Sequence, residues 1–367
     1  MTIALLLIGG LAVLTVGAEL LVRGAAKLAA IARISPLVIG LTVVAYGTST
    51  PELTVSAVTA FQGKTDIALG NVVGSNIFNV LFILGLSALI IPLSVHAQLL
   101  RFDVPLMIGV SLLTWVLGFD GRIGVLDGGI LFAGLIAYTT WSVYASRKES
   151  RPVQQEFASE FGPPELPASG SGKRQMLANV GFVLAGLAML VLGSKWFVDG
   201  ASEIARMAGL TELVIGLTVV AAGTSLPEVA TSVVAAMKGE RDIAVGNVIG
   251  SNLFNILGVL GTAGLMSGLN DSGGLAVSET ALRFDIPVMI AAAVGCLPIF
   301  LTGRTISRLE GGILLGYDVI YTTWLIFSAY GHPSLRTLKY AVLVFALPIT
   351  VMVLVIDLWR HFRGRAA

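Results

Sequence analysis

The chain contains two copies of one 46-residue sequence, and this duplication limits the possible folds more than any other feature. The copies occupy residues 40–85 and 216–261, and they align without a gap at 29 identical positions of 46. Both copies are strongly apolar, yet each carries one carboxylate, Glu52 in the first and Glu228 in the second. A carboxylate in such surroundings is costly unless something binds it. The duplication therefore predicts a polar site to which both copies contribute.

Composition places the two copies in a membrane. Only 12% of the 367 residues are charged, against about 25% in soluble domains, and the mean hydropathy is +0.88. The net charge of +1 does not point to a nucleic-acid partner. A spanning helix needs about 20 mostly apolar residues, and eleven such stretches occur. They lie near residues 3–22, 37–61, 67–91, 103–119, 125–144, 177–197, 212–237, 243–267, 285–302, 309–330 and 338–358.

One hydrophilic stretch divides the first ten spans into two sets of five. Residues 146–176 are polar and rich in Pro, Ser and Gly, which is typical of a linker. The motif RFDxP, at Arg101 and again at Arg283, extends the duplication beyond the 46-residue copies. The predicted domains are a first five-helix repeat at 1–145, a cytoplasmic linker at 146–176, a second five-helix repeat at 177–331, and an extra transmembrane helix with a basic tail at 332–367.

The odd number of spans in each half has a geometric consequence. Because five helices end on the face opposite to the one where they began, the second half enters the membrane from the other side, as in many transporters. The predicted fold is an all-α polytopic membrane protein, an inverted five-plus-five transmembrane helix repeat plus one extra C-terminal helix. With the N-terminus outside, sixteen Lys and Arg residues lie on the cytoplasmic side and seven outside. This bias predicts that the linker and the C-terminus are cytoplasmic.

Polar residues within each copy gather first around a proline. Pro51, in the sequence GTSTPE, lacks an N–H and disturbs the helix, which predicts that carbonyls near Ala45 and Thr48 are free to face a ligand. Thr48 and Glu52 are four residues apart, so they lie on one helical face. The second copy repeats this arrangement with Thr224, Pro227 and Glu228.

A second polar group follows on the next span, in the sequence GSN[IL]FN. Ser75 and Asn79 are four residues apart in the first copy, as are Ser251 and Asn255 in the second. The ligand atoms that both groups offer are all oxygens, which suit hard cations such as Ca²⁺. Neither copy contains the His or Cys that would suit zinc or copper. The sequence therefore predicts a site for hard cations between the two copies.

The paired motifs GTSxPE and GSN[IL]FN resemble the α-repeats of the calcium/cation antiporter superfamily, most closely its prokaryotic sodium/calcium exchanger branch. The resemblance covers about residues 1–330. It implies a secondary active antiporter, not an enzyme, that exchanges Ca²⁺ for Na⁺ across the prokaryotic cytoplasmic membrane by alternating access. It implies no resident cofactor, since the ions are the cargo. Matched by position, the implied ion ligands are Glu52, Glu228, Thr48, Thr224, Ser49, Ser225, Ser75, Ser251, Asn79, Asn255 and the carbonyls of Ala45 and Ala221.

One position departs from the family pattern. Well-understood sodium/calcium exchangers carry Asp in one repeat where this chain has Asn79 or Asn255. The site therefore has at most two negative charges, which neutralise one Ca²⁺ but leave an excess positive charge with three Na⁺. The coupling ion thus stays open among Na⁺, H⁺ and K⁺, because carboxylates can also carry protons. The extra span at 338–358 is a second departure from the ten spans that the resemblance implies.

Two other classes of function fit the sequence less well. A channel would usually offer symmetric filter rings from several subunits, whereas an inverted repeat favours alternating access. An intramembrane enzyme would need catalytic residues within the spans, and these contain no Ser–Lys or Ser–His pair, Asp dyad or HExxH motif. Exchange of ions is therefore the favoured function.

Overall fold

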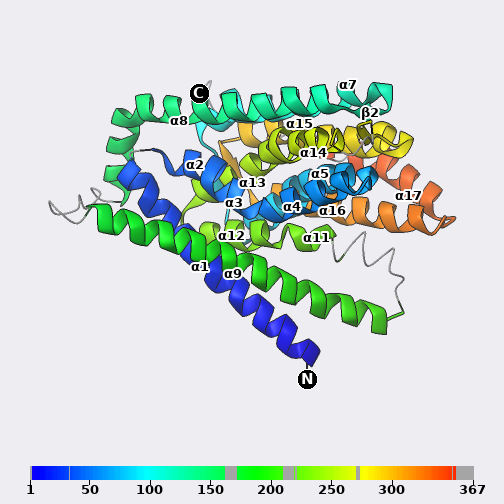
Figure 1. Ribbon diagram of the computed structural model, residues 1–367, viewed down its shortest axis with the longest axis horizontal. Helices are drawn as coiled ribbons and strands as arrows, with labels where there is room; N and C mark the ends of the chain where they lie inside the picture. Colours follow the sequence, from blue (N-terminus) through cyan, green and yellow to red (C-terminus); the bar gives the residue numbers. More distant parts are fainter. Residues whose placement is uncertain are drawn as a thin grey trace.

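The computed structural model shows a mostly helical chain and describes residues 2–32, 34–161, 172–209, 219, 221–269, 273–348 and 350–352 (Figure 1). Within these residues, eight helical stretches are long and apolar enough to cross a membrane. They are Ile3–Ala32, Thr65–Ile90, Leu99–Asp120, Val125–Ser146, Arg174–Met207, Arg241–Ser267, Ala281–Leu301 and Arg308–Ala329. Two shorter apolar helices, Pro36–Thr48 and Leu226–Met237, lie at the predicted spans 37–61 and 212–237. Residues 212–218 and 220 of the second span are outside the described residues.

The helices of the two halves follow the same order. The first half contains α1 (Thr2–Ala32), α2 (Pro36–Ile39), η1 (Gly40–Val44), α3 (Ala45–Thr48), α4 (Thr50–Phe61), α5 (Thr65–Phe78), η2 (Asn79–Leu84), α6 (Gly85–Ile90), η3 (Leu99–Asp103), α7 (Val104–Leu117), η4 (Gly118–Asp120) and α8 (Val125–Phe161). The second contains α9 (Gly172–Met207), α11 (Ala221–Thr224), α12 (Leu226–Met237), α13 (Arg241–Phe254), η6 (Asn255–Leu260), α14 (Gly261–Ser267), η7 (Ala281–Asp285), α15 (Ile286–Leu301) and α16 (Arg308–Ala329). α17 (Leu335–Ala341) and η8 (Val342–Ala346) follow, in the region predicted as an extra span, of which residues 349 and 353–367 lie outside the described part.

Wider π-helical turns begin at Asn79 and Asn255, which are equivalent positions in the two copies. Each turn lies inside a helix that continues on both sides, from α5 through η2 to α6 and from α13 through η6 to α14. Such insertions are rare and often mark functional sites. Both predicted amide ligands therefore lie where the regular helix geometry changes.

Short strands between the helices show that the halves run in opposite directions. β1 (Leu93–Ser94), between the third and fourth spans of the first half, pairs antiparallel with β4 (Thr305–Ile306), between the fourth and fifth spans of the second. β2 (Arg122–Ile123) and β3 (Leu275–Ala276) make the reciprocal pair. Loops that pair must lie on the same membrane face. This exchange of loop positions is what an inverted repeat requires, because parallel halves would place equivalent loops together.

α1 and α9 occupy equivalent places in the two halves and lie together along one side of the molecule (Figure 1). They are antiparallel and touch through backbone at glycines. A Cβ atom at Gly17 would lie 2.9 Å from the carbonyl oxygen of Gly186, and one at Gly193 would lie 2.8 Å from that of Gly10. Only glycine permits this approach, and the seven-residue spacing of these glycines along each helix repeats the contact.

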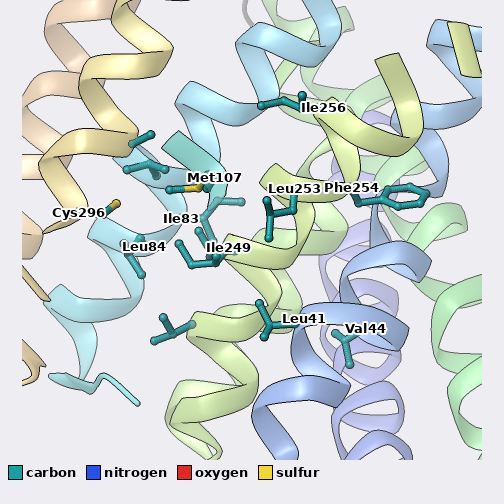
Figure 2. Close-up of a cluster of buried hydrophobic side chains, with 14 of the residues drawn as sticks. Leu41, Val44, Ile83, Leu84, Met107, Ile249, Leu253, Phe254, Ile256 and Cys296 are labelled. Carbon is teal, nitrogen blue, oxygen red and sulfur yellow. The ribbon is translucent and has the colours of Figure 1, made fainter. Parts of the chain in front are cut away.

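The apolar core lies between the central helices of the two repeats. Figure 2 shows a cluster in which Leu41 and Val44 from η1, Ile83 from η2, and Ile249 from α13 are buried together. The central helices hold the repeats against each other, so that polar residues on both can meet.

Parts of the predicted linker are helical, because α8 continues to Phe161 and α9 begins at Gly172.

Inversion predicts opposite accessibility for equivalent turns after α4 and α12. Gln62 and Lys238 are exposed and equivalent, and each precedes a glycine with positive φ, Gly63 and Gly239, that is best left unchanged. In a Cys296→Ala background, which removes the buried native thiol, Gln62→Cys should react with a membrane-impermeant maleimide from one face and Lys238→Cys from the other. Labelling of both cysteines from the same side of sealed vesicles would contradict the inverted fold.

Candidate ion-binding site

The two predicted spans that carry the GTSxPE motif are each broken at its serine. Ser49, between α3 and α4, has φ −82° and ψ 13°, and Ser225, between α11 and α12, has φ −90° and ψ 6°. Pro51 and Pro227 then lie in the first turn of a new helix, where the missing N–H removes no bond. The break places Glu52 in the first turn of α4, where the helix dipole favours a negative charge.

The two serines connect the repeats through the carboxylates. Ser49 Oγ donates to Glu228 Oε1 at 2.7 Å, and Ser225 Oγ donates to Glu52 Oε1 at 2.8 Å. Both glutamates are buried, at 0% and 1% exposure. A serine at a helix N-cap usually accepts from its own helix, but here neither makes that bond. Each half therefore supplies the hydroxyl donor for the carboxylate of the other half.

The remaining predicted hydroxyls gather around the same carboxylates. Ser75 Oγ lies 3.3 Å from Ser225 Oγ and so joins the Glu52 side of the site. Thr48 and Ser251 lie beside the Glu228 carboxylate. Thr224 takes the equivalent position beside Glu52. The structure thus brings together all the hydroxyl residues that the sequence predicted.

The helix break does not free the Ala45 carbonyl from its backbone hydrogen bond, as the sequence had predicted it would. This oxygen accepts from the Ser49 N–H at 3.0 Å. The Thr48 hydroxyl lies 3.2 Å from it and also 3.2 Å from Asn247 Oδ1, with one proton for the two acceptors. The proline does not free it, because an N–H at residue 51 would bond four residues back, at Gly47. Ala221, the equivalent residue, is the first of α11 at the edge of the described chain.

The two predicted amides bond to asparagines of the opposite repeat. Asn79 Nδ2 donates to Asn252 Oδ1 at 3.0 Å, and Asn255 Nδ2 donates to Asn76 Oδ1 at 3.1 Å. All four side chains are buried. With their nitrogens engaged, Asn79 and Asn255 keep their own oxygens for another partner.

Two further asparagines support the glutamates, and the sequence prediction missed them. Asn71 Nδ2 donates to the Glu52 carbonyl at 3.2 Å, and Asn247 Nδ2 donates to the Glu228 carbonyl at 3.4 Å. Asn247 Oδ1 also accepts from Thr48 Oγ1 at 3.2 Å. The available signal was the tripeptide GNV, identical in both copies and polar within an apolar span. These residues fix the backbone from which the carboxylates extend.

Several buried oxygens at the centre of this arrangement have no hydrogen-bond partner among the residues that the structure describes. They are Glu52 Oε2, Glu228 Oε2, Asn79 Oδ1, Asn255 Oδ1 and Ser251 Oγ. An unpaired buried acceptor costs about 1–3 kcal/mol, and all five of these can face a cation. Over the described ranges, no group of three or more His, Cys, Asp or Glu side chains gathers at one point. The donor set therefore fits hard cations held by few charges and many neutral oxygens.

An inverted helical repeat with broken helices and a cation-accepting centre defines a secondary transporter. The family model described as sodium/calcium exchanger protein matches residues 2–144 and 178–327. The chain belongs to this sodium/calcium exchanger family and is an integral membrane protein.

Individual relatives agree with this assignment. The chain is 39% identical over 325 residues to the putative antiporter CaxA of Alkalimonas amylolytica, covering 87% of this chain and 97% of the relative. It is 34% identical over 349 residues to the sodium/calcium exchanger MaX1 of Methanosarcina acetivorans, covering 88% and 98%. The fold is similar to that of the sodium-calcium exchanger NCX_Mj, with a TM-score of 0.73 at 28% identity, covering 88% and 99% of the two chains.

The bond between Ser49 and Glu228 predicts a measurable loss of stability. Ser49→Ala should lower the free energy of unfolding by about 1.5–3 kcal/mol, because a hydrogen bond to a buried charged group is lost. The midpoint of thermal unfolding of the purified protein measures the effect. Ser87→Ala is the matched control, since Ser87 is also buried but its hydroxyl has no hydrogen-bond partner. Equal midpoints for the two variants would show that the bond across the repeats does not stabilise the site.

Proposed function

We propose that the carboxylates, hydroxyls and amides at the break points form the site through which this Na⁺/Ca²⁺ antiporter carries its ions. The observation that supports the assignment is the group of buried, unpaired oxygens contributed by both repeats. A cation would supply the partner that each of these oxygens lacks. The ligands we assign are Glu52, Glu228, Thr48, Thr224, Ser49, Ser225, Ser75, Ser251, Asn79 and Asn255. The ions are cargo, and we assign no resident cofactor.

The charge of the site limits how the ions share it. Glu52 and Glu228 together neutralise one Ca²⁺, so a calcium-loaded site is neutral. Because Asn79 and Asn255 add oxygen but no charge, three Na⁺ would leave one positive charge in a medium of low dielectric constant, where it is costly. We therefore infer that this chain binds fewer than three Na⁺ at once in the occluded site.

The inverted fold gives the site two equivalent routes of access. Since equivalent segments of the halves face opposite sides of the membrane, a path that opens through one half has a counterpart through the other. The bias of Lys and Arg supports an orientation with the N-terminus outside and the C-terminus inside. The prokaryotic relatives support placement in the cytoplasmic membrane.

Neutralising either glutamate should abolish most of the exchange. Glu52→Gln and Glu228→Gln keep the shape of the side chain but each removes half of the formal charge at the site. We expect the affinity for Ca²⁺ to fall by about 10- to 100-fold. This is the range expected when one interaction with a charged group is lost. Uptake of Ca²⁺ into Na⁺-loaded proteoliposomes measures this. Glu203→Gln is the control, because Glu203 is exposed and pairs with Arg206 at the surface. Normal uptake by either site variant would contradict the assignment.

A third carboxylate should change the response to Na⁺. Asn255→Asp places a negative charge where Asn255 Oδ1 has no partner, and three carboxylates balance three monovalent ions. We expect the dependence of Ca²⁺ efflux on external Na⁺ to become steeper. Efflux curves recorded at several pH values test this, and repetition with K⁺ or a proton gradient in place of Na⁺ identifies the coupling ion. Curves identical to those of the parent at every pH would show that Asn255 does not line the site.

A further inference from the structure

The side chains behind the ion-facing amides form two chains of hydrogen bonds that end at methionines. In the first chain, Asn255 Nδ2 donates to Asn76 Oδ1, and Asn76 Nδ2 donates to the Asn252 carbonyl at 3.2 Å and to Met289 Sδ at 3.7 Å. Met289 lies on α15 and is 2% exposed. The chain therefore leads from the ion site to a buried thioether on another helix.

The second chain is the counterpart of the first across the repeats. Asn79 Nδ2 donates to Asn252 Oδ1, and Asn252 Nδ2 donates to Met107 Sδ at 3.4 Å. Met107 lies on α7, is 1% exposed, and belongs to the buried cluster drawn in Figure 2. The two methionines occupy equivalent positions, because each follows the RFDxP motif after one intervening residue.

An amide group can present either its oxygen or its nitrogen to an ion, and its shape hardly distinguishes the two. The bonds it makes decide which atom faces which way. A cation needs the oxygen of Asn79 or Asn255, since an NH₂ group would repel it. The asparagine behind each one determines the choice, because its own oxygen can bond only to the NH₂ side of its neighbour.

We propose that Asn76 and Asn252 are positioning residues that turn the oxygens of Asn255 and Asn79 toward the ion, with Met289 and Met107 fixing the far ends. The proposal rests on the ion site assigned above. A thioether suits the far end because sulfur accepts an N–H weakly but is too soft to compete for Na⁺ or Ca²⁺.

The two series of hydrogen bonds do not fix the orientation of their amides equally firmly. Asn76 Nδ2 has two acceptors, the backbone carbonyl of Asn252 and the sulfur of Met289. Asn252 Nδ2 has a described bond to Met107 Sδ alone. The orientation of Asn79 therefore depends on a methionine, whereas the orientation of Asn255 is also held by backbone.

This difference predicts unequal effects of equivalent substitutions. Met107→Leu should raise the apparent KM for Ca²⁺ by about two- to tenfold, the range expected for one hydrogen bond, while the maximal rate of exchange stays close to that of the parent. Met289→Leu should have a smaller effect on KM. Leucine conserves the volume of methionine, so both variants should fold. Met266→Leu, on α14 away from these asparagines, is the control that should leave KM unchanged.

Two further variants separate amide orientation from packing. In an Asn79→Asp background, residue 79 presents an oxygen in either orientation, so Met107→Leu should no longer raise KM. Met107→Gln, which restores an acceptor for the Asn252 N–H, should return KM toward that of the parent. Ca²⁺ uptake by proteoliposomes gives KM and the maximal rate for each. The same rise in KM in both backgrounds, or no rise with Met107→Leu in the parent, would overturn the proposal.

The site assignment has its own test in the same assay. Asn79→Leu removes the oxygen itself, so an unchanged KM for this variant would remove Asn79 from the site. A raised KM for Asn79→Leu together with an unchanged KM for Met107→Leu would leave the assigned site intact and reject only the role of the methionine. The two failures are therefore distinguishable.

Discussion

A carboxylate buried in a membrane needs a hydrogen-bond donor, and here the donor for each carboxylate comes from the other half of the chain. Ser49 serves Glu228 and Ser225 serves Glu52. The helix break at each serine favours this reciprocity, because a serine hydroxyl inside a continuous helix often bonds to its own backbone instead. The reciprocity also requires close contact between the central helices of the two repeats. The inverted arrangement places equivalent residues opposite one another, so a single sequence motif supplies both partners, and the oxygens left over converge where a cation can bind them.

Much of this arrangement could be predicted from the sequence, because the duplication preserves both the motifs and their spacing. The sequence predicted Glu52, Ser49 and their counterparts as polar residues of one site, and it also predicted the helix breaks and the inversion. The predicted first span, 3–22, was shorter than α1, since apolar length marks only the part of a helix that lies in hydrocarbon. The two-residue strands carry no pattern that a sequence could show. The support from Asn71 and Met107 was missed because these residues act through contacts between distant segments, which spacing along one helix cannot reveal.

The strand pairs and the glycine contacts join the two halves of the chain in different ways. β1–β4 and β2–β3 tie loops of the two halves together, and the exchange of loops places the two pairs on opposite membrane faces. Hydrogen bonds at both faces oppose separation of the halves along that edge. α1 and α9 instead meet through close backbone contacts at glycines spaced seven residues apart.

The reciprocal bonds also set an order for synthesis of the protein in the cell. Glu52 and its donor Ser225 are separated by 173 residues. At about 5–20 residues per second, Glu52 waits roughly 9–35 s for that donor to be made, and the first repeat enters the bilayer with an unsatisfied acid group. During this interval the Glu52 carboxyl group is best accommodated with water around it, because the second half that supplies its serine donor has not yet been made. The second repeat thus ends a vulnerable stage of insertion, and it does so by supplying one serine hydroxyl.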